Sequence, residues 1–169
     1  SSADPCLMIC RNKLGVVYMA LYVDDIYASG DEPALDDSII GLRKYFKIKV
    51  VDDLRDYLSC EIIFNADKSK AWLGQPHLIK SLENKFGVKT SQTYKTPGTP
   101  GQGVLRPKEG DKRITAEDQS NYRSGVGMLL YLVKHSRPDI INAVRELSKS
   151  MDGASLAAFK ELKRVITFV

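Results

Sequence analysis

Two adjacent aspartates, Asp24 and Asp25, have the strongest candidate chemistry in the sequence. They interrupt a run of β-branched and aromatic residues at positions 16–28, so we expect them at the bend between two short strands. Two carboxylates at such a bend can point into one cleft and share a hard divalent cation such as Mg²⁺ or Mn²⁺, which prefers oxygen ligands. A metal pair held in this way stabilises the attacking 3′ oxygen and the leaving pyrophosphate in nucleotidyl transfer.

The residue types alone leave a second interpretation open. Aspartate is common in turns because its side chain hydrogen-bonds the nearby backbone. The sequence has two further pairs of this kind, Asp36-Asp37 and Asp52-Asp53, and their composition does not distinguish them from the first. A lone Asp-Asp pair is therefore typical of a turn as well as of a metal site.

The charges are distributed unevenly along the chain. Its 169 residues include 25 basic and 21 acidic side chains, a net charge of +4. Residues 1–66 have 7 basic and 11 acidic side chains, whereas residues 67–169 have 18 and 10. A basic part that holds a polyanion and an acidic part that processes it would have this pattern. Mild segregation of charge is also common without any functional meaning, so this alternative stays open.

Cysteine and histidine are too few for several classes of site. The three cysteines are an odd number, and the two histidines form no zinc-binding pattern with them. The longest uncharged apolar run, residues 16–23, is far shorter than a membrane helix, so we expect no membrane partner. We expect a reduced, intracellular protein, with the cytoplasm and nucleus not distinguished. The first residue is not Met and the chain ends on an apolar run, so we also expect a piece of a longer polypeptide.

The first part of the chain is predicted to be α+β with mostly antiparallel strands, because its connections are too short for crossovers. The pattern predicts three strands at residues 7–10, 16–23 and 26–28, with Asp24-Asp25 at the second bend. Asp31 is a candidate N-cap for a helix with Leu35, Ile39, Leu42 and Phe46 on its inner face. Three more strands are predicted at residues 47–51, 57–64 and 71–73. Trp72, in the last of these strands, is expected to be a packing anchor rather than a platform on which a nucleic-acid base stacks.

The second part is predicted to be helical. Pro76 begins a helix that ends at Gly87, and its exposed side bears Lys80 and Lys85. The Pro- and Gly-rich residues 88–114 are predicted to be a functional loop or a linker. A capping box of Thr115 and Asp118 is predicted to begin the next helix, and Ser136 is predicted to cap the one after it. A last amphipathic helix is predicted after Gly153. The apolar faces of these four helices are predicted to contain Leu78, Ile79, Leu82 and Phe86; Tyr122, Val126, Leu129, Leu130 and Val133; Ile140, Ile141, Val144, Leu147 and Met151; and Leu156, Phe159, Leu162 and Ile166.

The whole chain resembles the reverse transcriptase of copia-type retrotransposon polyproteins, and the matching stretches follow the family's order. Residues 21–26 (Leu-Tyr-Val-Asp-Asp-Ile) resemble the catalytic hairpin, and residues 54–62 resemble the Leu-Phe-Leu-Gly-x-Glu hairpin of the family. Residues 73–75 with the helix after them resemble the first thumb helix. The other matching stretches are residues 2–7, 29–31, 96–97, 122–127, 130–132 and 137–140.

The resemblance implies an α+β fragment of a right-hand polymerase: an antiparallel palm half-sheet with one packed helix, then a helical thumb and connection bundle. It implies three parts, with the palm at residues 1–75, a thumb helix and loop at 76–114, and the remaining thumb and start of the connection at 115–169. Asp24 and Asp25 would hold the catalytic Mg²⁺ or Mn²⁺, with Tyr22 and Val23 near the primer terminus and incoming deoxynucleotide. Leu58, Ser59, Cys60 and Glu61 would grip the primer strand. Lys80 and Lys85 would contact the backbone of the RNA/DNA template–primer duplex.

Two departures from the family pattern shape the functional expectation. The third carboxylate and the fingers of such polymerases lie upstream of the catalytic hairpin, before Ser1, and Ser59-Cys60 stands where the family has glycine and an aliphatic residue. We therefore expect an RNA-directed DNA polymerase segment that is inactive as this isolated chain. The alternative is a retroelement fragment kept by its host as a non-catalytic module that binds nucleic acid or protein. Open strand edges in a partial palm sheet would also favour self-association.

Overall fold

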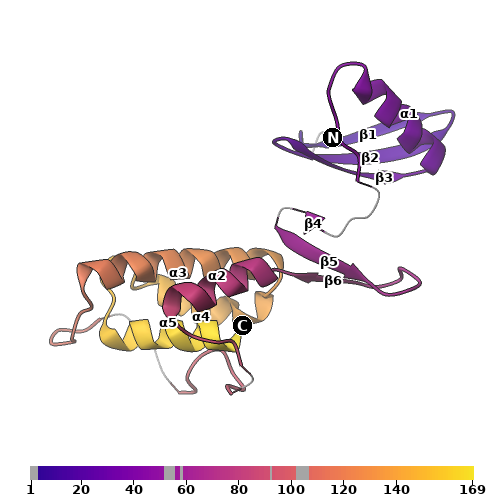
Figure 1. Ribbon diagram of the computed structural model, residues 1–169. Helices are drawn as coiled ribbons and strands as arrows, with labels where there is room; N and C mark the ends of the chain where they lie inside the picture. The colour runs from indigo at the N-terminus through magenta and orange to yellow at the C-terminus, as the bar shows by residue number, and fades with distance from the viewer. Residues whose placement is uncertain (1–3, 52–55, 58, 92, 102–106) are drawn as a thin grey trace. The chain divides into compact units, whose positions relative to one another are not determined.

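A three-stranded antiparallel meander begins the chain in the computed structural model (Figure 1), which describes residues 4–51, 56–57, 59–91, 93–101 and 107–169. Strands β1 (Leu7–Asn12), β2 (Gly15–Tyr22) and β3 (Asp25–Gly30) pair in the order β1-β2-β3. Helix α1 (Glu32–Arg43) follows them. These elements form the first of two compact units, Ser1–Asp52, and the second is Asp53–Val169. The boundary between the units thus precedes the second group of strands, whereas the family resemblance implies a boundary after residue 75.

Helix α1 packs against one face of the β1-β2-β3 sheet. Strand alternation puts Val17, Met19 and Leu21 on that face, and Val17 is completely buried together with Ala34 of α1. Asp31 occupies the N-cap position of α1, as predicted, but its side chain makes no capping bond. Instead its Oδ2 accepts a hydrogen bond from the backbone N–H of Val16 at 2.8 Å, which ties the start of the helix to β2.

Two sequence predictions in this unit are wrong. The helix ends at Arg43, so Phe46 is not on its inner face and is 62% exposed. The predicted strand at residues 47–51 has no regular structure. A β-branched stretch becomes a strand only where a neighbouring strand completes its hydrogen bonds, and the structure provides no such neighbour for residues 47–51 within the described part of the chain.

The second unit begins with three short antiparallel strands, β4 (Asp56–Tyr57), β5 (Cys60–Phe64) and β6 (Ala71–Gly74). Strand β6 lies where the sequence predicted it. The single strand predicted over residues 57–64 is wrong, because the chain reverses between Tyr57 and Cys60, which pair with each other. Ser59 in this reversal has a left-handed φ of 63°, which a continuous strand does not allow. Figure 1 shows β5 and β6 as a two-stranded ribbon with a turn at its far end.

Helices make up the rest of the second unit: α2 (Pro76–Phe86), α3 (Ala116–His135), the 3₁₀ turn η1 (Pro138–Ile140), α4 (Ile141–Ser148) and α5 (Leu156–Phe168). The ends of α2 and the start of α3 follow the predicted signals. Gly87 ends α2 with a left-handed φ of 61°, a conformation that glycine adopts without strain. The hydroxyl of Thr115 accepts a hydrogen bond from the N–H of Asp118 at the start of α3, and Ser155 caps α5 in the same way through Ala158.

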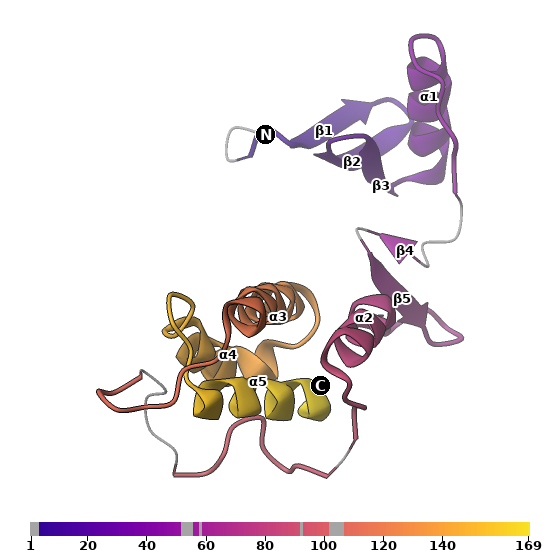
Figure 2. The same ribbon diagram turned by 60° about the vertical axis from the view of Figure 1, so that its left-hand side comes forward.

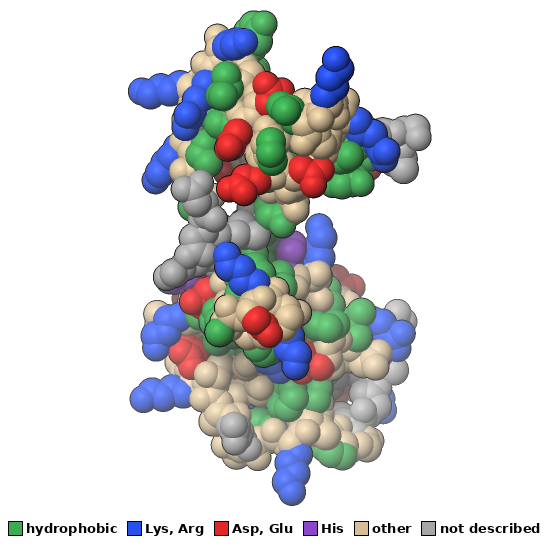
Figure 3. All heavy atoms as spheres, turned by 90° about the vertical axis from the view of Figure 1, so that its right-hand side faces the viewer, with side chains coloured by type: hydrophobic (Ala, Val, Ile, Leu, Met, Phe, Trp, Pro, Cys, Tyr) green, Lys and Arg blue, Asp and Glu red, His purple; other side chains and the backbone are tan. Residues whose placement is uncertain are grey.

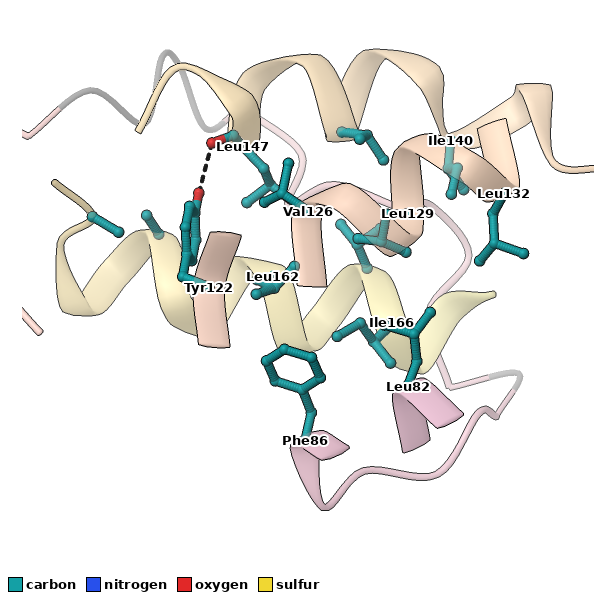
Figure 4. Packing of buried hydrophobic residues seen from close by; sticks show 14 residues of the cluster. Leu82, Phe86, Tyr122, Val126, Leu129, Leu132, Ile140, Leu147, Leu162 and Ile166 are labelled. Carbon is teal, nitrogen blue, oxygen red and sulfur yellow. Dashed lines mark hydrogen bonds between the residues drawn. The ribbon is translucent and has the colours of Figure 1, made fainter. Parts of the chain in front are cut away.

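The apolar faces of these helices enclose one hydrophobic core, in which α3 packs against α2, α4 and α5 (Figures 1, 2 and 4). Within the described part of the chain, no helix is both long enough and apolar enough to cross a membrane. The buried members of the core are Leu82, Phe86, Tyr122, Val126, Leu129, Leu132, Ile140, Val144, Leu147, Ala154, Ala158, Leu162, Val165 and Ile166.

Four details of the helix prediction are wrong. Leu130, Ile141 and Leu156 are exposed rather than part of the core. The inner stripe of α3 is instead displaced toward Gly125 and Leu132, because Gly125 lets the ring of Phe86 approach the helix backbone. Ser136 does not cap the next helix: its hydroxyl donates to Oε1 of Gln75 at 2.7 Å.

The Pro- and Gly-rich segment lies along α5 in the parts that the structure describes. The backbone N–H of Ser91 donates to the carbonyl of Thr167 at 2.8 Å. Further along, Thr99 donates its backbone N–H and its hydroxyl to the two carboxylate oxygens of Glu161, at 2.6 and 2.8 Å. The guanidinium of Arg164 lies 3.9 Å from the ring centre of Tyr94. This segment is therefore anchored to the helical core at several points.

Candidate functional site

Asp24 and Asp25 lie at the tip of the β2–β3 hairpin. Tyr22 and Asp25 are paired across the two strands, which leaves Val23 and Asp24 as a two-residue turn. Val23 has a φ of 53° and is 88% exposed. A β-branched residue in the left-handed region is strained by about 1–3 kcal/mol, and strain of this kind is concentrated at functional sites. The bend that the sequence predicted is therefore present but lies one residue earlier, because Val23, predicted in the strand, is in the turn and Asp25 begins β3.

The hairpin presents Asp25 on the sheet face opposite α1. Cross-strand partners share a face, so Tyr22 and Asp25 lie on the same side. Strand alternation adds Tyr18 and Tyr27 to this side, while Val17 lies on the side of α1. We call this side the open face. It carries an acidic group at one end of a surface rich in exposed tyrosine.

The two carboxylates suit a magnesium site in the type of their donor atoms. Both residues are exposed at the hairpin tip and offer oxygen ligands only. In proteins Mg²⁺ is typically held by one or two carboxylates, with substrate phosphates and water completing the octahedron. The described residues contain no group of three or more His, Cys, Asp or Glu side chains placed to hold a metal. Asp24 and Asp25 therefore fit a site that a bound phosphate-bearing substrate or a further ligand completes.

The other acidic pairs are in different settings. Asp36 and Asp37 lie within α1, not at a bend between strands, and Oδ2 of Asp37 accepts a hydrogen bond from Asn12 at 3.3 Å. Asp52 and Asp53 lie outside the described residues. Of the described pairs, only Asp24-Asp25 is at a hairpin tip.

The primer-grip-like residues lie at the reversal between β4 and β5. Leu58 is outside the described residues. Ser59 is exposed, with the left-handed φ noted above, whereas Cys60 is buried and Glu61 is exposed on β5. Glycine adopts such a φ freely, whereas serine is strained there. The departure from the glycine of the resembled family thus falls at the residue where glycine has a physical advantage.

Lys80 and Lys85 are both exposed on α2, but they do not form a single row. Five helical residues separate their directions by about 140°. The ammonium of Lys80 lies 3.2 Å from Oε2 of Glu83, whose other oxygen accepts two hydrogen bonds from Thr90. These bonds from Thr90, followed by the contact with Lys80, lower the pKa of Glu83. Lys80 therefore has a local counter-ion, whereas Lys85 forms no salt bridge with any residue that the structure describes.

The structure groups Tyr22, Val23, Asp24 and Asp25 in one hairpin of the first unit, and it places the primer-grip-like residues and both lysines in the second. The open face was not predicted from the sequence. Its signal was the tyrosines at positions 18, 22 and 27, which share a face only once the hairpin register is known, and the first two were obscured because residues 19–21 between them are also apolar. Figure 3 shows exposed hydrophobic side chains beside acidic and basic ones on the visible surface of the chain.

The chain is similar along its whole length to segments of much longer polyproteins. It is 27% identical over 174 residues to the retrovirus-related Pol polyprotein from transposon TNT 1-94 of Nicotiana tabacum, a match that covers 99% of this chain and 13% of the polyprotein. It is 30% identical over 170 residues to the retrovirus-related Pol polyprotein from transposon RE1 of Arabidopsis thaliana, covering 100% of this chain and 11% of the polyprotein.

A third relative is much shorter. An uncharacterized mitochondrial protein of Arabidopsis thaliana is 32% identical over 156 residues, which cover 90% of this chain and 61% of that protein. No protein-family model matches the chain. No solved structure matches it either. The similarities support a fragment of a retrotransposon Pol polyprotein. The chain spans only 13% and 11% of the lengths of the two polyproteins that it matches.

Proposed function

We propose that this chain is the palm and thumb segment of an RNA-directed DNA polymerase within a retrotransposon Pol polyprotein. The observation that carries the proposal is the β2–β3 hairpin, whose two-residue turn brings Asp24 and Asp25 to an exposed tip. The similarity to Pol polyproteins along the whole chain supports it. Neither observation depends on the other, because the hairpin is a property of the structure and the similarity is spread over both units.

In this proposal the two carboxylates bind the catalytic Mg²⁺ or Mn²⁺. A divalent metal pair, when bound, stabilises the attacking 3′ oxygen of the primer and the leaving pyrophosphate. Tyr22 flanks the acids on the open face, and the exposed turn residue Val23 projects beside them toward the primer terminus and the deoxynucleotide.

The second unit contacts the template–primer duplex in this proposal. Residues 58–61 hold the primer strand, with Ser59 and Glu61 exposed at the reversal. Lys80 and Lys85 contact phosphates from different sides of α2, as their directions require. Such contacts position a duplex without reading its sequence, which suits an enzyme that copies any template.

The burial pattern of the first unit supports its being part of a larger domain. Among its described residues, only Val17 and Ala34 are buried apolar side chains. Large apolar side chains are exposed on both sheet faces, including Met8 and Ile26 on the side of α1 and Ile9 and Tyr18 on the open face. A unit of about 50 residues that buries so little apolar surface is too weakly stabilised to fold by itself. Further protein covering part of these faces would complete its core.

A second candidate function is a non-catalytic module that binds nucleic acid or protein. Two observations favour it. The acidic tip has no third metal ligand among the described residues, and a similar sequence makes up 61% of an uncharacterized protein that is far shorter than a Pol polyprotein. A module of this kind would not need the strained turn at Val23, and for this reason we prefer the polymerase.

Primer extension on an RNA template separates the two functions. The assay is run with this chain and with a longer polypeptide that includes the upstream segment of the parent reading frame. We expect extension in the longer polypeptide only, and a loss of a hundredfold or more on Asp24→Asn or Asp25→Asn, because a catalytic metal contributes several kcal/mol. Asp36→Asn, on α1, is the matched control and keeps full activity. Extension that survives both hairpin substitutions, or a longer polypeptide with no activity, would contradict the polymerase.

A further inference from the structure

Trp72 is the single tryptophan of the chain, and it is exposed. It lies on β6 in the two-stranded ribbon with β5, and 54% of its surface is accessible. The prediction that Trp72 is a packing anchor is therefore wrong. A large aromatic side chain left half in water is a candidate contact for a partner, since its burial is worth more than that of any other residue type.

The neighbours of Trp72 on the ribbon form a flat pad that ends in positive charge. Ile63 is its direct cross-strand partner. The pairing continues to the end of the ribbon, where the N–H of Asn65 donates to the carbonyl of Lys70 at 3.2 Å. Lys70 therefore shares the side of Trp72, about 7 Å along the strand. We call the surface formed by Ile63, Lys70 and Trp72 the Trp72 face.

The turn at the end of the ribbon adds a second cation and holds its only acid in hydrogen bonds. Lys68 is exposed there. The carboxylate of Asp67 accepts hydrogen bonds from Asn65 at 2.5 Å, from the N–H of Ser69 at 3.0 Å and from the hydroxyl of Ser69 at 2.7 Å. The exposed acid Glu61 shares the side of Ile63 but lies toward the opposite end of the ribbon. A negatively charged ligand is thus attracted toward the turn and away from Glu61.

The other side of the ribbon has a different character. It contains Ile62, Phe64, Ala71 and Leu73, with no charged residue among these strand positions. That composition is suited to packing against protein. An aromatic ring in line with lysines is instead the arrangement that binds single-stranded nucleic acid, where bases stack on the ring and cations contact the phosphates.

We propose that the Trp72 face binds single-stranded nucleic acid. An unpaired base stacks on the indole of Trp72 against Ile63, and the ammonium groups of Lys70 and Lys68 contact the backbone phosphates on the side of the turn. The site is separate from the Asp24-Asp25 hairpin in both residues and chemistry. Binding at the Trp72 face requires neither a metal nor catalysis, so its test does not depend on whether the proposed polymerase function is correct.

Fluorescence tests the proposal directly, because the emission of the chain reports on Trp72 alone among tryptophans. The protein is titrated with a short oligodeoxyadenylate, with a duplex of the same length, and with inorganic polyphosphate. Stacking quenches indole emission, so we expect strong quenching by the single strand and little by the duplex or by polyphosphate. The Asp24→Asn, Asp25→Asn double variant binds and quenches as the unchanged chain does.

Variants of the ribbon locate the contact through the anisotropy of a labelled oligodeoxyadenylate. Trp72→Ala weakens binding about five- to 150-fold, the range for loss of one base–aromatic stack. Leu73→Ala, on the other side of the ribbon at a residue that is 52% exposed, is the matched control and leaves affinity unchanged. Lys70→Ala lowers the slope of log affinity against log salt by about 0.7, as expected for one phosphate contact with a single strand. Lys112→Ala, in the loop before α3, does not change the slope.

Each contrary result overturns the proposal. Absence of binding does so, as does binding that leaves Trp72 emission unchanged. If polyphosphate quenches as strongly as the single strand, the face recognises charge alone. If the duplex quenches as strongly as the single strand, binding does not require an unpaired base. Equal losses from Trp72→Ala and Leu73→Ala would indicate disruption of the ribbon. If circular dichroism shows that Trp72→Ala does not fold, the polyphosphate comparison and Lys70→Ala decide the question.

Discussion

The hydroxyl of Tyr122 on α3 donates a hydrogen bond to the carbonyl of Leu147 on α4 at 2.7 Å (Figure 4). Leu147 is next to the last residue of α4, where helix carbonyls have no partner within the helix. Tyr122 is completely buried, and its ring also packs near Phe159, with 6.5 Å between the ring centres. The carbonyl of Leu147 also accepts a hydrogen bond from the backbone N–H of Ser150 at 3.1 Å. The side chain of Tyr122 thus fills the core between α3 and α5 and adds a second donor at the end of α4.

Removal of this hydroxyl is expected to destabilise the second unit. Tyr122→Phe keeps the ring but removes one of the two hydrogen bonds that the carbonyl of Leu147 accepts, which costs about 0.5–1.5 kcal/mol. Thermal unfolding followed by circular dichroism measures the change. Tyr45→Phe is the control, because that side chain is 83% exposed and its substitution is expected to have an effect within about 0.5 kcal/mol. Equal effects of the two substitutions would show that the hydroxyl of Tyr122 does not stabilise the fold.

Stability at alkaline pH is expected to depend on the same residue. Burial raises the pKa of Tyr122 above its ordinary value of about 10, and a hydrogen bond with Ser150 offsets part of the shift. The folded state therefore holds this proton more tightly than the unfolded state. The resulting stabilisation is complete below pH about 10 and is lost progressively as the pH rises above it. Urea unfolding from neutral to alkaline pH should show that the free energy of unfolding falls more steeply with pH in the unchanged chain than in Tyr122→Phe. Parallel curves would contradict the raised pKa of Tyr122.

Lys80→Ala and Lys85→Ala test the contact of α2 with duplex nucleic acid. Each loss of a phosphate contact lowers the slope of log affinity against log salt by about 0.9. Because the two lysines point about 140° apart, both slopes change only if the duplex reaches two sides of α2. Filter binding over a salt series measures this, with Lys108→Ala in the loop before α3 as the control. A slope that is unchanged in both variants would mean that these lysines are only solvated.

The helices of the second unit were predictable because their signals are local. Pro76 and Gly87 bound α2, Thr115 caps α3, and the apolar spacing identified most of the core. What could not be predicted is how the helices rotate against one another. Leu130 and Leu132 are equally apolar, and only the approach of Phe86 to Gly125 decides that Leu132 is buried.

The strands and the candidate site were less predictable, because strands depend on distant partners. The bend at Asp24-Asp25 was predicted from its turn residues and is present, but its left-handed Val23 has no sequence signal. Residues 47–51 have the composition of a strand, but among the described residues no neighbouring strand pairs with them. The exposure of Trp72 was missed since tryptophan is ordinarily an anchor of packing, and only the register of β5 and β6 shows that it faces outward beside Lys70.

Two glycines of α3 are expected to respond to alanine in opposite directions. A Cβ at Gly125 would lie 2.5 Å from Cζ of Phe86 and 3.1 Å from Cδ2 of Leu162, so Gly125→Ala forces α2 away and costs about 1–3 kcal/mol. A Cβ at Gly127 meets nothing within 4 Å, so Gly127→Ala gains about 0.5–1 kcal/mol of helix propensity. Urea unfolding of the two variants gives the comparison. Destabilisation by both would contradict the packing of Phe86 described above.

Ser59→Gly is expected to stabilise the reversal between β4 and β5. Ser59 has a φ of 63°, a conformation that is strained for serine and free for glycine, so the substitution is expected to gain about 1 kcal/mol. Ser124→Gly, at an exposed position within α3, makes the same chemical change in a helix and is expected to lose about 0.5 kcal/mol. Hydrogen exchange of the β5 amides should slow in Ser59→Gly and stay unchanged in Ser124→Gly. If Ser59→Gly instead speeds exchange in β5, the serine side chain holds the reversal in place, and the glycine of the resembled family has no advantage in this chain.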